Sequence, residues 1–183
     1  MKKVYIFIAP HFEETEAIGT IDVLRRAGID VESVSISNEK VVESSHGVKI
    51  ITDKTFNECD FNQGNMIILP GGMPGTRNLQ NDKNLEALIA KYNKEGKYLA
   101  AICAAPLVYG QMDLLNGKEA VCYPGFEDEL KGAVIKKDAV AVSSNFITSR
   151  GAGTVFDFAL KLVEILKSKD EAEKVKNSII YKQ

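Results

Sequence analysis

The sequence has few cysteines and few histidines, and both shortages exclude kinds of site. Its three cysteines, Cys59, Cys103 and Cys122, are an odd number at no metal-ligand spacing, so neither a disulfide framework nor a zinc site is expected. Its two histidines, His11 and His46, both precede Cys103. A catalytic dyad of a cysteine and a downstream histidine is therefore excluded. We expect no metal and no cofactor.

The sequence also lacks a strong charge bias and long apolar runs. The net charge is -2 and the lysines are scattered, so a nucleic-acid partner is not expected. No apolar stretch approaches the length that spans a bilayer, and the run at 4–9 is too short for a signal peptide. We expect one cytoplasmic domain over residues 1–183, in which a free thiol stays reduced and no membrane is bound.

Apolar runs and helical periodicities alternate along the chain. Strands are expected at 4–9, 30–37, 66–69 and just before Cys103, with short strands within 40–51 and at 120–123, 134–135, 139–143 and 146–148. Helices are expected from residue 13 to Gly28, at 82–93, from Pro106 to Met112, at 154–166 and at 170–175. This alternation predicts an α/β fold with a parallel, doubly wound sheet.

The stretch from Tyr98 to Pro106 predicts a nucleophile elbow at Cys103. A buried strand leads directly into a proline-started helix, and the small residues Ala101 and Ala105 leave room for a tight turn. The amides at the start of that helix are expected to favour a thiolate over a thiol. The alternative is that Cys103 is a small buried hydrophobe, which is the common fate of a free cysteine.

Two further loops are expected at the same edge of the sheet, because ligands of such folds bind beyond the carboxyl ends of the strands. The loop 70–75 contains Gly71 and Gly72, and Gly72 lets a backbone N–H approach a reacting carbonyl. With the Ala104 N–H it would form an oxyanion hole. An ordinary glycine turn is the alternative.

The loop 10–16 supplies the acids Glu13, Glu14 and Glu16. One of them, Glu16 or a neighbour, is expected beside the cysteine, where burial near a thiolate would raise its pKa and let it shuttle a proton. The others are expected only to complement the dipole of the helix that begins there.

Five stretches together resemble one protein family. They are FEETE at 12–16, RRAG at 25–28, LPGG at 69–72, AAICAAP at 100–106 and TSRGAGT at 148–154. In this order they resemble the ThiJ/PfpI superfamily, in the subgroup of the parkinsonism-associated protein deglycase and its bacterial relatives. The resemblance covers essentially the whole chain. It implies a flavodoxin-like sandwich, a single domain of class I glutamine amidotransferase-like type at 1–183, and a homodimer.

The resemblance also implies roles for individual residues. Cys103 would be the nucleophile, Glu16 the acid hydrogen-bonded to it, and the amides of Gly72 and Ala104, with Gly71 beside them, the oxyanion-type donors. Many members carry a histidine where this chain has Tyr123, and a tyrosine is a poor base at neutral pH.

Two further departures concern the neighbours of the site. Ala104 follows the cysteine where protease-type members have a histidine, which argues against peptidase activity. The subgroup often has an arginine where His46 lies. A solvated turn is the plainer interpretation of His46. Candidate accessory residues are therefore Tyr123, His46, Glu13 and Arg26.

Three functions share this site. The first is a cysteine-dependent glyoxalase or protein deglycase that acts, without glutathione, on methylglyoxal-like 2-oxoaldehydes or their adducts. The second is a non-enzymatic sensor of oxidative stress, or chaperone, that works through oxidation of Cys103. The third is a small-molecule binding protein like those of the thiamine pathway. The elbow, the paired glycines and the acid favour the enzyme.

Overall fold

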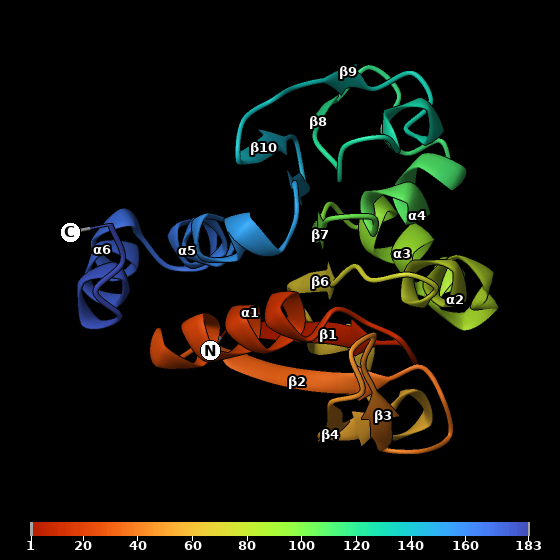
Figure 1. The fold of residues 1–183 in the computed structure, drawn as a ribbon, viewed down its shortest axis with the longest axis horizontal. Helices are drawn as coiled ribbons and strands as arrows, with labels where there is room; N and C mark the ends of the chain where they lie inside the picture. The colour runs from red at the N-terminus through yellow and green to blue at the C-terminus, as the bar shows by residue number, and fades with distance from the viewer. Residues whose placement is uncertain (1, 183) are drawn as a thin grey trace.

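A seven-stranded sheet forms the centre of the molecule (Figure 1). The computed structural model describes residues 2–182. The order of the strands is β10-β11-β7-β6-β1-β2-β5, and every neighbouring pair is parallel except β10 and β11. Their bounds are β1 Lys3–Ile8, β2 Asp30–Ser35, β5 Lys54–Thr55, β6 Met66–Leu69, β7 Tyr98–Ile102, β10 Val140–Ser143 and β11 Phe146–Ser149.

Helices cover both faces of this sheet, which confirms the doubly wound α/β fold. One face carries α1 (Glu14–Arg26), α5 (Val155–Leu166) and α6 (Lys169–Ser178). The other carries α2 (Gly75–Asn81), α3 (Lys83–Lys94) and α4 (Pro106–Gln111). Two small sheets, β3 (Val41–Glu43) with β4 (Lys49–Ile51) and β8 (Glu119–Ala120) with β9 (Val134–Ile135), lie outside the main sheet.

The alternation of side chains along each strand builds the two cores. On β1, Val4, Ile6 and Ile8 pack under α1 and α5, whereas Tyr5 and Phe7 face the opposite layer. All five are fully buried, because a parallel sheet with helices on both faces has no wet side.

The expected elements are present, with three differences. The loop after β6 leads into the seven-residue helix α2, which was not expected from the sequence. Its sequence has only one apolar side chain, Leu79, so no helical periodicity indicates it. The strand expected at 120–123 is only the two-residue β8, and the short edge strand β5 was not expected.

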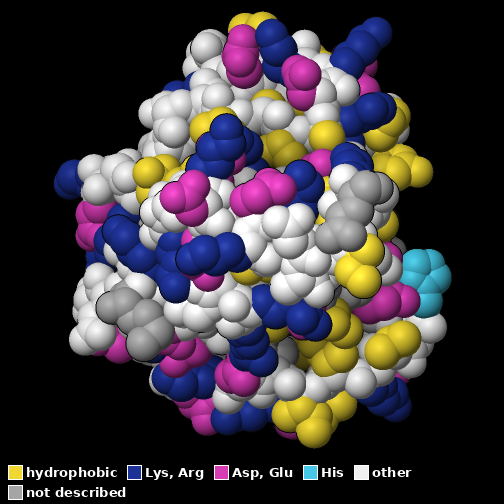
Figure 2. Space-filling view, turned by 90° about the vertical axis from the view of Figure 1, so that its left-hand side faces the viewer, with side chains coloured by type: hydrophobic (Ala, Val, Ile, Leu, Met, Phe, Trp, Pro, Cys, Tyr) yellow, Lys and Arg dark blue, Asp and Glu magenta, His cyan; other side chains and the backbone are white. Residues whose placement is uncertain are grey.

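The surface over α5 and α6 carries acidic and basic side chains intermixed, with apolar side chains between them (Figure 2). Within residues 2–182, no helix has both the length and the apolar character needed to cross a bilayer.

Candidate active site

Cys103 lies in a sharp turn between β7 and α4. Its φ of 64° is in the left-handed region, which a non-glycine residue rarely adopts. The turn is fixed from two sides: the Cys103 N–H donates to Ser149 O (3.0 Å), and the Tyr123 N–H donates to Cys103 O (2.8 Å). Ala101 and Ala105 beside it are fully buried. This is the geometry of a nucleophile elbow, and the side chain is half-buried rather than part of the core.

Glu16 is the acid that reaches the cysteine. It lies on the first turn of α1, is 1% exposed, and accepts a hydrogen bond from the Gly71 N–H at Oε2 (2.8 Å). Its other oxygen, Oε1, is buried without a well-aligned hydrogen bond within the described chain. Glu13 caps the helix instead, because its Oε2 accepts the Glu16 N–H (2.6 Å).

Gly71 and Gly72 fit between these groups only because they lack a side chain. A Cβ on Gly71 would lie 2.6 Å from the Cys103 Cβ and 2.9 Å from Glu16 Oε2. Gly72 has a φ of 95°, and a Cβ there would lie 2.5 Å from the Glu13 nitrogen. The paired glycines therefore allow the close approach of three loops.

Cys103 and Glu16 titrate as a coupled pair. Burial raises the pKa of Glu16 to about 7, the direction expected from the sequence. Burial, and then the negative charge of Glu16, raise the pKa of Cys103 to about 12. The N–H groups of Ala104 and Gly72 lower it, but by less.

The amides act on the thiol in the expected direction, since they lower its pKa, but burial and the charge of Glu16 outweigh them. Above about pH 7 the pair retains one proton. A thiolate forms when that proton passes from Cys103 to Glu16. The protonation state of the sulfur therefore depends on both groups together, rather than on the cysteine alone.

A cavity of about 160 Å³ opens over the sulfur. It is lined by Gly72, Met73, Cys103, Ala104, Tyr123 and Phe126. A larger hollow of about 480 Å³ near Asn93 and Asn145 lies where β7 and β11 begin, and no cysteine or carboxylate lines it. The small cavity is the one in which a reacting carbonyl would meet both the thiol and the amides.

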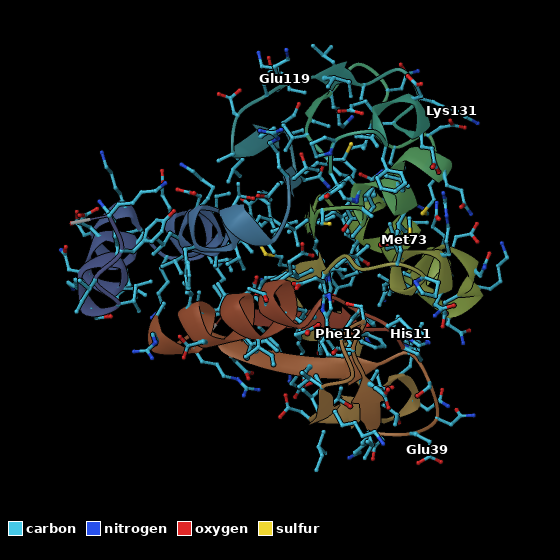
Figure 3. The ribbon with its side chains drawn as sticks, in the orientation of Figure 1. His11, Phe12, Glu39, Met73, Glu119 and Lys131 are labelled. Carbon is cyan, nitrogen blue, oxygen red and sulfur yellow. The ribbon has the colours of Figure 1, made fainter. Side chains whose placement is uncertain are left out.

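Met73 and Phe126 line this cavity but were not among the residues expected from the sequence. Neither follows an apolar periodicity, and only the path of the loops brings them together. Figure 3 shows Met73 above His11 and Phe12. A Cβ on Gly72 or Gly75 would lie within 2.6 Å of His11 O, so the loop 70–75 passes directly over the loop after β1.

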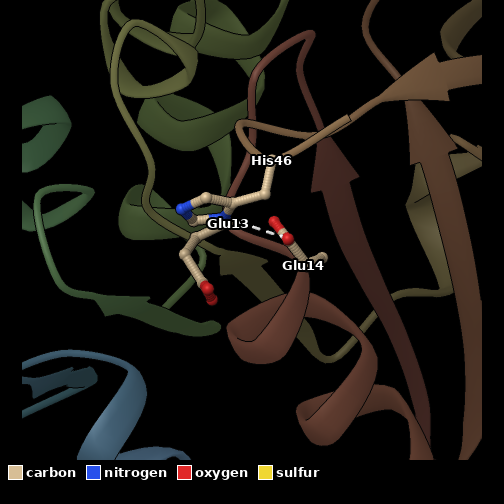
Figure 4. Close-up of side chains that lie close together, drawn as sticks. All are labelled: Glu13, Glu14 and His46. Carbon is tan, nitrogen blue, oxygen red and sulfur yellow. Dashed lines mark hydrogen bonds and ion pairs between the residues drawn. The ribbon is translucent and has the colours of Figure 1, made fainter. Parts of the chain in front are cut away.

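The candidate accessory residues lie in different places. Tyr123 is at the mouth of the cavity and is 50% exposed. His46 lies on the β3–β4 turn, where its Nδ1 contacts Glu14 Oε1 (2.9 Å), as Figure 4 shows. Glu13, Glu14 and His46 place possible metal-ligating atoms within 4.8 Å of one another, and the ion pair between Glu14 and His46 accounts for the arrangement.

Arg26 is far from the cavity. It lies in the last turn of α1, ten residues beyond Glu16, and its guanidinium pairs with Asp22 (2.7 Å) at the surface. A helix rises about 1.5 Å per residue, so this distance alone separates Arg26 from Glu16 by roughly 15 Å. Within this chain neither Arg26 nor His46 lines the cavity at Cys103.

Comparison with known proteins places the chain among relatives of one kind. Protein DJ-1 homolog B of Arabidopsis thaliana is 40% identical over 98% of this chain, and the match covers 41% of that longer protein. The match to homolog A covers 46%, so the chain spans less than half of either plant relative. The glutathione-independent glyoxalase DJR-1.2 of Caenorhabditis elegans is 33% identical, over 93% of this chain and 91% of that one.

A solved structure and a family model agree with these relatives. The structure described as Toxoplasma gondii DJ-1, oxidized, superposes with a TM-score of 0.96 at 36% identity, and covers 100% of both chains. The family model described as DJ-1/PfpI family matches residues 2–165. With the flavodoxin-like strand order and the Cys103 elbow in place, the chain belongs to the DJ-1/PfpI family.

Proposed function

We propose that the protein is a cysteine-dependent, glutathione-independent glyoxalase or deglycase-type enzyme, whose substrates are methylglyoxal-like 2-oxoaldehydes or their adducts. The observation that carries the proposal is the contact of Gly71 with both Glu16 and Cys103. It supports the proposal because a carboxyl group whose pKa burial raises to about 7 lies beside the thiol, and the N–H groups of Gly72 and Ala104 also act on the sulfur. The C. elegans relative named as a glyoxalase supports the reaction class.

The first step is addition to the aldehyde. The Cys103 thiol passes its proton to Glu16, and the sulfur forms a bond to the aldehyde carbon. The carbonyl electron pair moves to oxygen, where the N–H groups of Gly72 and Ala104 stabilise the negative charge. Glu16 then returns the proton to that oxygen, which completes a hemithioacetal.

The second step is a rearrangement. Glu16 takes the C–H proton of the hemithioacetal carbon and delivers a proton to the neighbouring carbonyl carbon through an enediol, while the hydroxyl proton of the first carbon passes to the oxygen of the second. The first carbon is oxidised and the second reduced, so no external oxidant is required. The product is a thioester of a 2-hydroxy acid on Cys103. Water hydrolyses it and regenerates the thiol.

The test is lactate formation from methylglyoxal without glutathione. We expect Cys103→Ser to lose at least about 100-fold in kcat/KM, because the hydroxyl is a much weaker nucleophile at neutral pH. Cys59→Ser is the matched control, since Cys59 is also a partly buried free cysteine but does not line the cavity. A Cys103→Ser enzyme with full turnover would overturn the proposal.

A second candidate function is oxidation sensing through the same cysteine. Cys103 is half-buried and borders the cavity, whereas Cys122 is buried in the core. The oxidised state of the Toxoplasma relative supports the candidate. A sulfinate at Cys103 would accept hydrogen bonds from protonated Glu16 and the two amides. Peptide mass spectrometry at low peroxide should then show Cys103 oxidised before Cys59 and Cys122.

We also propose that the chain is a cytoplasmic homodimer. Its three cysteines are free, as a reducing compartment would keep them. Ile18 on α1 and Val48 and Ile51 around β4 are 43%, 45% and 77% exposed. The ion pair between Glu14 and His46 connects α1 to the β3–β4 turn, so a second copy of the chain would cover the exposed side chains of α1 and β4 together. Sedimentation of wild type and Ile51→Lys tests the dimer.

A further inference from the structure

Arg150 is a half-buried cation that has no partner in the described part of the chain. It follows β11 and lines a second cavity of about 300 Å³ together with Tyr123, Pro124 and the loop 151–154. Among residues 2–182, no hydrogen bond or ion pair engages its guanidinium. A guanidinium presents five donors and stays charged at every physiological pH, so leaving it unpaired on a cavity wall is unusual.

Two acids of the same neighbourhood, Glu127 and Glu129, do not pair with it. Glu127, Glu129 and Arg150 all act electrostatically on Cys122, so they share one neighbourhood. Glu129 is held by both terminal nitrogens of Arg77 (2.7 and 2.8 Å). Glu127 accepts the Gly125 N–H (2.7 Å). Both carboxylates therefore already accept hydrogen bonds from other donors.

Tyr123 connects this cation to the reactive cysteine. Its side chain lines both the cavity over Cys103 and the cavity at Arg150. The ring lies against the backbone beside Arg150, since a Cβ on Gly151 would be 3.4 Å from Tyr123 Cδ2. Its N–H holds the carbonyl of Cys103. Tyr123 therefore borders both the cavity over the sulfur and the cavity that Arg150 lines.

We propose that Arg150 is a specificity-determining residue that selects aldehydes carrying an anionic group, a carboxylate or a phosphate, on the side of the molecule away from the reacting carbonyl. The carbonyl occupies the small, apolar cavity at Cys103, and the anion occupies the cavity at Arg150. This inference rests on the proposed function for the identity of the reacting group, and it is tested without turnover.

The test compares two alkylating reagents of nearly equal size, iodoacetate and iodoacetamide. Both react with Cys103 by forming a carbon–sulfur bond and releasing iodide, but only iodoacetate is anionic. The rate of labelling is followed on the Cys103 peptide by mass spectrometry. We expect Arg150→Gln to lower the ratio of the iodoacetate rate to the iodoacetamide rate by about 5- to 10-fold, and Arg150→Lys to retain most of it.

Arg26→Gln is the matched control. It removes the same charge from a surface arginine that lies on the far turn of α1 and is already paired. An unchanged ratio in Arg150→Gln, or an equal fall in Arg26→Gln, would overturn the inference. In an enzyme that turns over methylglyoxal, glyoxylate should also inhibit wild type more strongly than Arg150→Gln. Inorganic phosphate, added to compete with the anionic reagent, distinguishes a phosphate site from a carboxylate site.

The two proposals fail in distinguishable ways. Absent lactate formation with an intact alkylation ratio would remove the glyoxalase reaction and leave the anion site. Normal lactate formation with no effect of Arg150→Gln on the ratio would leave the reaction and remove the anion site.

Discussion

The two walls of the Cys103 cavity are built in different ways. The inner wall, at Gly72, is backed by Gly71 and Glu16 and has no spare space: Glu16 is 1% exposed, and a Cβ added to Gly71 would collide with its carboxylate. The outer wall, which consists of Tyr123 and Phe126, is open, and the half-exposed Tyr123 also lines the neighbouring cavity at Arg150. Tight packing fixes the groups that move protons, whereas the open wall can vary with the substrate. Changes to the inner wall should therefore affect the reaction itself, and changes to the outer wall should affect selectivity.

The largest effect is expected from Glu16→Gln. The amide cannot accept the thiol proton, and loss of a positioned acid or base typically costs about 10² to 10⁴ in rate. In wild type, kcat/KM should rise tenfold per pH unit and level off above about pH 7, where the pair has lost its first proton. In the variant this inflection should vanish, and activity should increase only at higher pH. A variant that retains the inflection near pH 7 would assign the proton to another group.

The same substitution should change how stability depends on pH. The pKa of Glu16 is raised from 4.5 to about 7 by burial, so its carboxyl group favours the folded state below pH 4.5. As pH rises from 4.5 to 7, the unfolded chain releases its proton before the folded chain does, and this stability is lost. Relative to Glu16→Gln, wild type should lose about 3 kcal/mol across this window, measured by urea unfolding at each pH.

Glu14→Gln is the control for the unfolding measurement, because the contribution of Glu14 to stability should change with pH in the opposite direction to that of Glu16. Burial tends to raise the pKa of Glu14, but its hydrogen bonds, including the one to His46, outweigh burial and lower it. Glu14 should therefore add stability above its unfolded pKa and lose that stability as the pH falls into the acid range. If the free energy of unfolding depends on pH equally in the two variants, the buried environment of Glu16 does not cause the pH dependence.

Gly71→Ala should disturb the inner wall by shape alone. The new Cβ would have to displace Cys103 or Glu16, and overpacking of this kind costs about 1–3 kcal/mol of stability. Misplacement of reacting groups by about 1 Å costs about 100-fold in rate. Gly153→Ala is the control for stability, since a Cβ there meets nothing within 4 Å. Thermal unfolding compares the two variants, lactate formation is measured on Gly71→Ala and wild type, and near-normal activity in Gly71→Ala would mean that the wall can yield.

The sequence predicts the parts of the molecule that have a strong periodic signal. The strands around β1, β6 and β7 follow apolar runs that a doubly covered sheet requires, and α5 follows a clear apolar stripe. The helix α2 could not be predicted in this way, because a short helix after a glycine-rich turn has too few apolar positions. Local patterns thus specify elements better than they specify the loops that connect them.

The candidate site likewise has features that a local sequence pattern predicts and features that depend on the assembled fold. Small residues around Cys103 indicate the elbow, since only a tight turn needs them on both sides. The pKa of the thiol could not be inferred from the elbow, because it depends on how deeply the fold buries Glu16 beside it. Arg26 was a candidate because it belongs to a sequence motif, but it lies in the last turn of α1 and is therefore far from the cavity.

The smallest effect is expected from Tyr123→Phe, on the outer wall. The variant keeps the ring that lines both cavities and the backbone N–H that holds the Cys103 carbonyl. It removes only a hydroxyl, and a tyrosine is a poor base at neutral pH. The value of kcat/KM should therefore fall by less than about threefold, whereas Tyr123→Ala, which removes the shared wall, should raise KM by more than it lowers kcat. A loss of tenfold or more in kcat for Tyr123→Phe would assign the hydroxyl a part in proton transfer and would make the outer wall part of the reaction.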